Sequence, residues 1–208
     1  MSKDSKFVFD AGAIALDLLN TRYLDKDQVL DLLRSPEDIV DWLIATGLPI
    51  EAALREPSFS TPSRRILFAE TQWLRQDVLL IIETLVSEGR PPPYTVDALN
   101  RVLRESTYSF RLTSSTNSRL GEQSHDPLEL NTDESASSVL GLLQPIALSA
   151  ARLVTEANPM RIRQCASESC ICWFLDTSKS GRRRWCSMAR CGNRAKVAKH
   201  YRQEKPTG

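Results

Sequence analysis

All five cysteines of the chain lie between positions 165 and 191. Four of them form two equally spaced pairs, Cys165-x4-Cys170 and Cys186-x4-Cys191, with fifteen residues between the pairs. Two short cysteine loops joined by a hairpin-sized spacer can place four sulfurs tetrahedrally around a metal. Four thiolates suit structural zinc best and leave no open position for chemistry. The spacing therefore predicts one structural Zn²⁺, and four reduced structural cysteines without a metal are the alternative.

Other reactive side chains lie close to these cysteines. Cys172 alternates with Cys170 along an expected strand and should face away from the metal, so we expect a small packed residue. A redox-sensing thiol or a substitute ligand is the other interpretation of Cys172. Trp173 and Trp185 are expected to form a small core around the metal, although aromatic residues also stack on single-stranded bases. Asp176 is interpreted as a turn residue or an arginine partner, and less readily as a catalytic acid.

Basic side chains concentrate in the same part of the chain. From Asn158 onward there are 12 Lys and Arg against 3 Asp and Glu, a net charge of +9, although the whole chain carries only +1. The preceding residues have 15 basic and 23 acidic side chains, a net charge of −8. The basic segment should be drawn to polyanions, and the acidic segment should be repelled by them. The candidate nucleic-acid-binding residues are Arg182, Arg183, Arg184, Arg194, Lys196, Lys199 and Arg202. For Arg194, bracing the metal site is the alternative.

The elements that must position these side chains follow from local patterns. Around the cysteines we expect a turn over 165–170, a strand over 171–175, a return strand over 182–185 and a helix from about Asn193. This order of knuckle, hairpin and helix is treble-clef-like, and a helix N-terminus there favours thiolates.

Upstream, apolar periodicity and cap residues predict a mostly helical segment. Strand patterns at 108–112 and 128–130 predict a small antiparallel ribbon. Helices are expected over 13–19, 35–46, 63–88, 96–104 and 135–156, with Pro145 as a kink or restart in the last. The fold class predicted is mainly α with a small antiparallel β ribbon (α+β) and a C-terminal treble-clef-like zinc finger. We expect domains over 1–157 and 158–208, which can pack into one body because no flexible linker separates them.

Several function classes are disfavoured. No apolar run approaches 18 residues and the N-terminus does not read as a secretory signal, so we expect a cytoplasmic protein without a membrane span. His125 and His200 have no partner at catalytic spacing, and there is no glycine-rich phosphate loop, nucleophile elbow or HExxH motif. The sequence therefore predicts that the protein is not an enzyme.

The C-terminal stretch WFLDTS…RRRWCSMARCGNRAKVAKHYR resembles the CGNR zinc finger, named for the tetrapeptide at 191–194. The front half resembles the ABATE domain that accompanies this finger, through ALDLLNT at 15–21, SPEDIVDWLIATGL at 35–48 and a long helix opening with Arg64-Arg65. This family is regarded as stress-induced transcription regulators. The resemblance therefore implies zinc binding, DNA binding and a role in transcription regulation and the stress response.

Two functional hypotheses follow. In the first, the finger binds DNA and the N-terminal domain senses a signal, for instance a small-molecule effector. A single finger reads few base pairs, so a homodimer formed through the N-terminal domain is then expected. In the second, the finger is a zinc-stabilised protein- or RNA-interaction module without an operator. The polar residues Asp17, Asn20, Thr21 and Arg22 are interpreted as a helix end and turn, and as pocket lining in the alternative.

Overall fold

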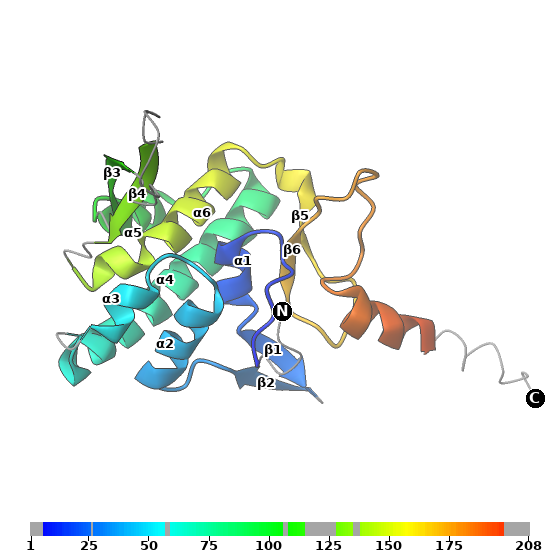
Figure 1. Ribbon diagram of the computed structural model, residues 1–208. Coiled ribbons are helices and arrows are strands. Elements are labelled where there is room, and N and C mark those ends of the chain that lie inside the picture. Colours follow the sequence, from blue (N-terminus) through cyan, green and yellow to red (C-terminus); the bar gives the residue numbers. More distant parts are fainter. Residues whose placement is uncertain are drawn as a thin grey trace, which may run out of the picture.

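A computed structural model describes residues 6–25, 27–56, 59–105, 108–114, 128–134 and 138–197. Helices form the body of the molecule, and the cysteine-rich segment lies at one end of it (Figure 1). The α-helices are α1 (Ile14–Leu19), α2 (Pro36–Ala45), α3 (Glu51–Arg55), α4 (Thr61–Glu88), α5 (Pro93–Leu103) and α6 (Gln144–Thr155). Short helical turns of other types are η1 (Leu140–Leu143), η2 (Pro159–Arg161) and η3 (Met188–Gly192).

The described strands form three two-stranded antiparallel sheets. They pair β1 (Arg22–Asp25) with β2 (Gln28–Asp31), β3 (Tyr108–Ser114) with β4 (Leu128–Glu134), and β5 (Ile162–Gln164) with β6 (Trp173–Leu175). The β3–β4 pair is the ribbon predicted near 108–130. The predicted class, mostly helical with small antiparallel strands, is therefore confirmed. No described helix has the length and apolar character needed to cross a membrane.

Helix α4 is the longest helix described, and α1, α2, α5 and α6 all contact it. Its buried apolar residues recur at helical spacing, which places one stripe against the core. They are Leu67, Leu74, Val78, Ile81, Ile82 and Leu85. Ile66 and Trp73 are apolar too but lie outside this stripe, because 53% and 62% of their surfaces are exposed. Both residues precede a member of the buried stripe by one position and so lie about 100° away from it.

The start of α2 agrees with the cap residues in the sequence. Ser35 and Asp38 form a reciprocal capping box at the start of α2, with Asp38 N donating to Ser35 Oγ and Ser35 N donating to Asp38. Pro145 lies in the first turn of α6, directly after η1, so it marks a restart of the helix. Helix α5 begins at Pro93, three residues before the predicted start at 96.

The cysteine-rich segment packs directly on the helical body. Helix α1 is almost wholly buried and contacts α4, α6 and β6. Leu175 N in β6 donates to Ala11 O at 2.7 Å. The Asn20 side chain donates to Trp173 O at 2.8 Å and accepts from Trp173 N at 2.9 Å. Asn20 is the C-cap of α1, as its interpretation as part of a helix end predicted, and its side-chain amide also bonds the backbone of β6. The body and the cysteine-rich segment therefore share one core.

Candidate metal centre

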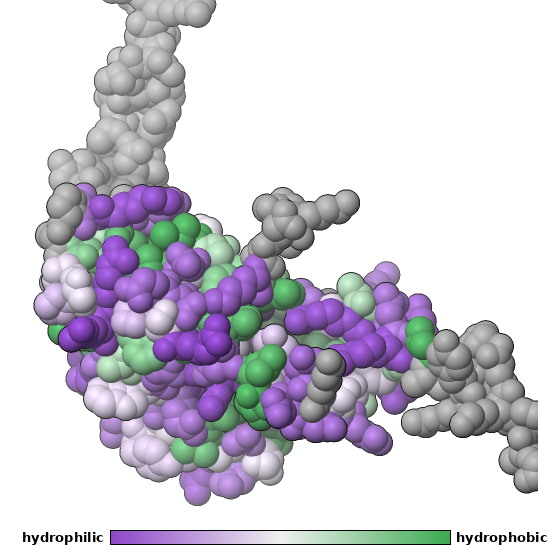
Figure 2. Space-filling model, turned by 90° about the horizontal axis from the view of Figure 1, so that it is seen from below, coloured by the Kyte–Doolittle hydropathy of each residue, from purple (hydrophilic) through white to green (hydrophobic). Residues whose placement is uncertain are grey.

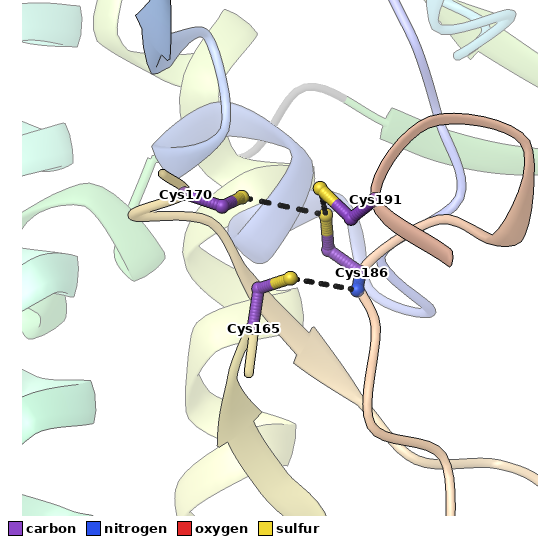
Figure 3. A group of neighbouring side chains, drawn as sticks. All are labelled: Cys165, Cys170, Cys186 and Cys191. Atoms are coloured by element: carbon purple, nitrogen blue, oxygen red, sulfur yellow. Dashed lines mark hydrogen bonds between the residues drawn. The ribbon is translucent and has the colours of Figure 1, made fainter. Parts of the chain in front are cut away.

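Four cysteine sulfurs converge from separate segments of the chain (Figure 3). Cys165 follows β5, Cys170 ends the first loop, Cys186 precedes η3, and Cys191 lies within it. All four are buried, and their sulfur atoms lie within 4.8 Å of one another. Cys186 Sγ is 3.7 Å from both Cys170 Sγ and Cys191 Sγ. A tetrahedron of sulfurs about 2.3 Å from zinc has edges of about 3.8 Å, so the arrangement fits one structural zinc ion.

Several hydrogen-bond donors approach these sulfurs, among them a backbone amide and a guanidinium. Cys186 N lies 3.4 Å from Cys165 Sγ, and the Arg194 guanidinium lies 3.3 Å from Cys191 Sγ. Four thiolates carry more negative charge than one Zn²⁺ neutralises, so such donors stabilise the bound state. The position of Arg194 agrees with the bracing role that the sequence left as its alternative.

The residues between Cys191 and Arg194 shape the metal-binding turn. A Cβ on Gly192 would lie 2.7 Å from Met188 Sδ and 3.3 Å from the Trp185 ring, so a larger residue would push these side chains away. The Asn193 side chain donates to Ala189 O at 3.3 Å, across the turn of η3. Each residue of the CGNR tetrapeptide therefore has a physical role: a thiolate, a close-packed glycine, a turn-closing amide and a guanidinium donor.

The predicted hairpin inside the finger is wrong. Strand β6 was expected to pair with a return strand at 182–185, but its partner is β5, which precedes Cys165. Residues 182–185 form no strand, and their backbone meets the first cysteine loop through Ala166 N donating to Arg184 O. The α-helical residues begin at Asn193 as expected and run over 193–197, but the turn η3 that precedes them from Met188 was not predicted.

Side-chain bonds hold the 178–186 segment in place of a β ladder. The buried Asp176 carboxylate accepts from Ser178 Oγ, Ser178 N and Arg183 N, and these bonds lower its pKa. The interpretation of Asp176 as a turn residue therefore agrees with the structure. The Arg183 guanidinium lies 4.6 Å from the Phe174 ring centre and donates to the carbonyls of Trp185, Cys186 and Asp10. Arg183 thus ties the metal loop to the N-terminal segment.

The neighbouring aromatic and thiol side chains are packed. Trp173 is buried, and Trp185 is partly buried against the same core. Cys172 is also buried, with 3% of its surface exposed, and it is not one of the four grouped cysteines. Its carbonyl accepts from Cys165 N at 2.9 Å, which fixes the loop that carries the first pair of sulfurs. The positions of the two tryptophans agree with the expected miniature core. Cys172 is packed as expected, but its thiol interacts with those of Cys170 and Cys186, so the expectation that it faces away from the metal is wrong.

The predicted nucleic-acid-binding residues are only partly brought together. Arg182, Arg184, Arg194 and Lys196 are exposed, and the Arg184 guanidinium lies 5.1 Å from the Trp185 ring centre. Lys199 and Arg202 lie outside the described residues. Hydrophilic residues cover most of the finger where it projects from the body (Figure 2).

Sequence reasoning missed one basic residue of this surface. Arg190 has 44% of its side chain exposed and lies 4.0 Å from Asp10 Oδ1. It was overlooked because the helix was expected to begin only at Asn193. Its spacing of four residues from Arg194 is the signal that could have found it, since such residues lie on one helix face.

Comparison with protein families gives two matches. A model described as "ABATE: Putative stress-induced transcription regulator" matches residues 12–157, and a model described as "CGNR zinc finger" matches residues 161–204. A search of curated proteins finds no match. The first model covers more than half of the chain, and the four cysteines of the second lie together as a zinc site requires. The chain therefore belongs to the ABATE family, and its C-terminal segment is a CGNR zinc finger.

Proposed function

We propose that the protein is a DNA-binding transcription regulator whose zinc finger binds duplex DNA and whose N-terminal domain senses a signal. The four cysteines Cys165, Cys170, Cys186 and Cys191 are the proposed zinc ligands. The role of the metal is structural, because four thiolates leave no coordination position for a substrate or water. We accordingly propose no enzymatic activity for this site.

The observation that carries the proposal is a set of unpaired cations on the finger. Within the described residues, no acidic side chain pairs with Arg182, Arg184 or Lys196, and all three are exposed. Some arginines of the helical body are instead held by acidic partners, as Arg75 is by Asp31 and Arg101 by Glu70. Cations left without acidic partners on a rigid frame are suited to phosphate oxygens, which then fix the protein on the duplex.

The test uses the full-length, zinc-loaded chain and selection from a pool of random DNA duplexes. Enriched duplexes are then titrated by fluorescence anisotropy over a series of salt concentrations. The variant Arg182→Ala/Arg184→Ala should weaken binding and make the slope of log K against log salt less negative by about 1.8, because each phosphate contact contributes about 0.9. The matched control is Arg90→Ala/Arg104→Ala, which removes the same charge from exposed positions of the helical body.

Two outcomes would overturn the proposal. One is the absence of duplex binding at low salt with zinc bound. The other is an equal loss of affinity in the control variant. That result would mean that the loss in the finger variant reflects the change in net charge and not the removal of phosphate contacts.

The alternative is an interaction module for protein or RNA. Exposed apolar side chains on the finger favour a protein partner, since Met188 and Val197 have 53% and 54% of their surfaces exposed. This alternative would be supported if the selection enriches no duplex and if the finger binds a protein partner even at high salt. Homodimer formation is proposed only together with DNA binding, and light scattering at micromolar concentration tests it.

A further inference from the structure

A cavity of about 390 Å³ lies where the helical body meets the finger. Its apolar wall is made by Leu19, Val29, Leu79, Ile171 and Trp173. These residues come from α1, β2 and α4 on one side and from the finger on the other. The other half of its ten lining residues are polar or charged. A cavity of this size that combines apolar side chains with polar groups can hold a small molecule. Neither the metal centre nor the exposed cations of the finger account for it.

The finger side of the cavity is continuous with the metal loop. Ile171 directly follows Cys170, and Trp173 follows Cys172. The backbone of Trp173 is held by the Asn20 side chain, and Leu19, the neighbour of Asn20, also lines the cavity. A molecule in this cavity therefore touches residues of both the helical body and the finger.

Positive charge exceeds negative charge at the end of the cavity formed by the β1–β2 pair. Both terminal nitrogens of the buried Arg75 guanidinium donate to the Asp31 carboxylate, at 2.9 and 2.6 Å. Arg22 Nε lies 3.4 Å from the same carboxylate. One carboxylate thus serves two guanidinium groups, which leaves a surplus of positive charge at this end.

Arg22 is the group through which this surplus can act. Its side chain is 48% exposed, and its two terminal nitrogens have no acceptor among the described residues. A guanidinium presents two parallel N–H donors, which match the two oxygens of a carboxylate. Glu83 lines the same cavity about 12 Å farther along α4 than Arg75, since helical residues rise 1.5 Å each. A carboxylate is thus attracted at the Arg22 end and repelled at the Glu83 end.

We propose that this cavity binds a small organic acid with an aromatic or aliphatic body. Its carboxylate pairs with Arg22, and its body packs on Leu79, Ile171 and Trp173. Binding of the acid follows from the cavity alone. Its role as the effector that adjusts the finger rests on the DNA-binding function proposed above.

The test titrates the full-length, zinc-loaded protein with 2-naphthoate and with its neutral counterpart 2-naphthamide, by calorimetry. We expect 2-naphthoate to bind once per chain and about tenfold more tightly than the amide, since hydrogen bonds to charged groups are the stronger ones. Arg22→Gln should remove this preference and leave the two affinities equal.

Blocking variants locate the site without touching the core. Gln76→Trp places a large ring at an exposed residue that lines the cavity, and it should abolish binding of both probes. Val86→Trp is the matched control, because Val86 is exposed on the same helix and does not line the cavity. It should bind 2-naphthoate as the wild type does.

The proposal is overturned if millimolar 2-naphthoate does not bind, if both probes bind the wild type equally, or if Gln76→Trp binds like the wild type. DNA anisotropy with and without 2-naphthoate separates the two proposals. A protein that binds 2-naphthoate but no duplex supports the cavity site and refutes only the DNA-binding function. A protein that binds duplex but neither probe refutes only the cavity site.

Discussion

Asn20 is the side chain that most directly joins the helical body to the finger, and Asn20→Ala tests that connection. The substitution removes a donor to Trp173 O and an acceptor for Trp173 N, both in a partly buried position. A net hydrogen bond contributes about 1 kcal/mol, and an unsatisfied buried group costs about 1–3 kcal/mol. Because Asn20 is only half-buried and water can reach part of the gap, we expect a loss of about 2–3 kcal/mol in the free energy of unfolding.

The assay is urea unfolding of the zinc-loaded protein, followed by tryptophan fluorescence, together with competition for zinc by a chelator. Since β6 directly follows the loop of Cys170 and Cys172, its release should also weaken zinc retention. Asn100→Ala is the control, because Asn100 lies in α5 without a described side-chain hydrogen bond. It should change stability by only a few tenths of a kcal/mol, in the stabilising direction, because alanine favours helix.

The reasoning is refuted if Asn20→Ala unfolds within about 0.5 kcal/mol of the wild type and retains zinc equally well. That result would mean that the amide does not connect the two parts. A loss of stability with unchanged zinc retention would confine the effect to the helical body and would also contradict the argument.

Three further predictions concern the metal, a close backbone contact and a buried carboxyl. Chelation should abolish the near-ultraviolet circular dichroism of the packed finger tryptophans. In measurements of zinc content, Cys170→Ser should lose zinc, whereas Cys172→Ser should keep about one ion per chain. Gly12 and Gly47 both have positive φ, 86° and 70°, but a Cβ on Gly12 would lie 3.1 Å from Leu175 O, whereas one on Gly47 would meet open space. Gly12→Ala should therefore lower the free energy of unfolding by about 1 kcal/mol more than Gly47→Ala, as measured by thermal unfolding. Burial raises the pKa of Asp17 to about 6, so the stability of the wild type falls as pH rises from about 4 through 6. Asp17→Asn should therefore be the more stable protein at pH 8, by about 2–3 kcal/mol in urea unfolding, and lose this advantage at pH 4.

The parts that the sequence predicted well are those set by local rules. Equal cysteine spacing was enough to select the four sulfurs that the fold brings together, because each pair closes a short loop. The Ser35-Pro36-Glu37-Asp38 start of α2 was readable for the same reason, since its capping box involves residues three positions apart.

The parts that were missed depend on contacts between distant residues. Strand β5 has only three residues, two of them polar, and nothing in its own pattern distinguishes it from a loop. Its pairing with β6 is decided by the burial of Ile162 and Phe174 in the common core. Arg183 was placed among the DNA contacts because of its charge, whereas its carbonyl acceptors include Asp10 O, 173 positions away.

The small size of the finger explains why these distant contacts exist. A segment of about 40 residues buries too little apolar surface to be stable alone, and metal binding supplies only part of the stabilisation that is missing. Here β6 obtains the rest from the helical body, through Ala11 and Asn20 on one side and through the shared burial of Phe174. The same strand contributes Trp173 to the cavity wall and continues the loop that carries Cys170. The signal that we propose for the helical body would therefore need no flexible linker to reach the metal centre, because the two parts share strand β6.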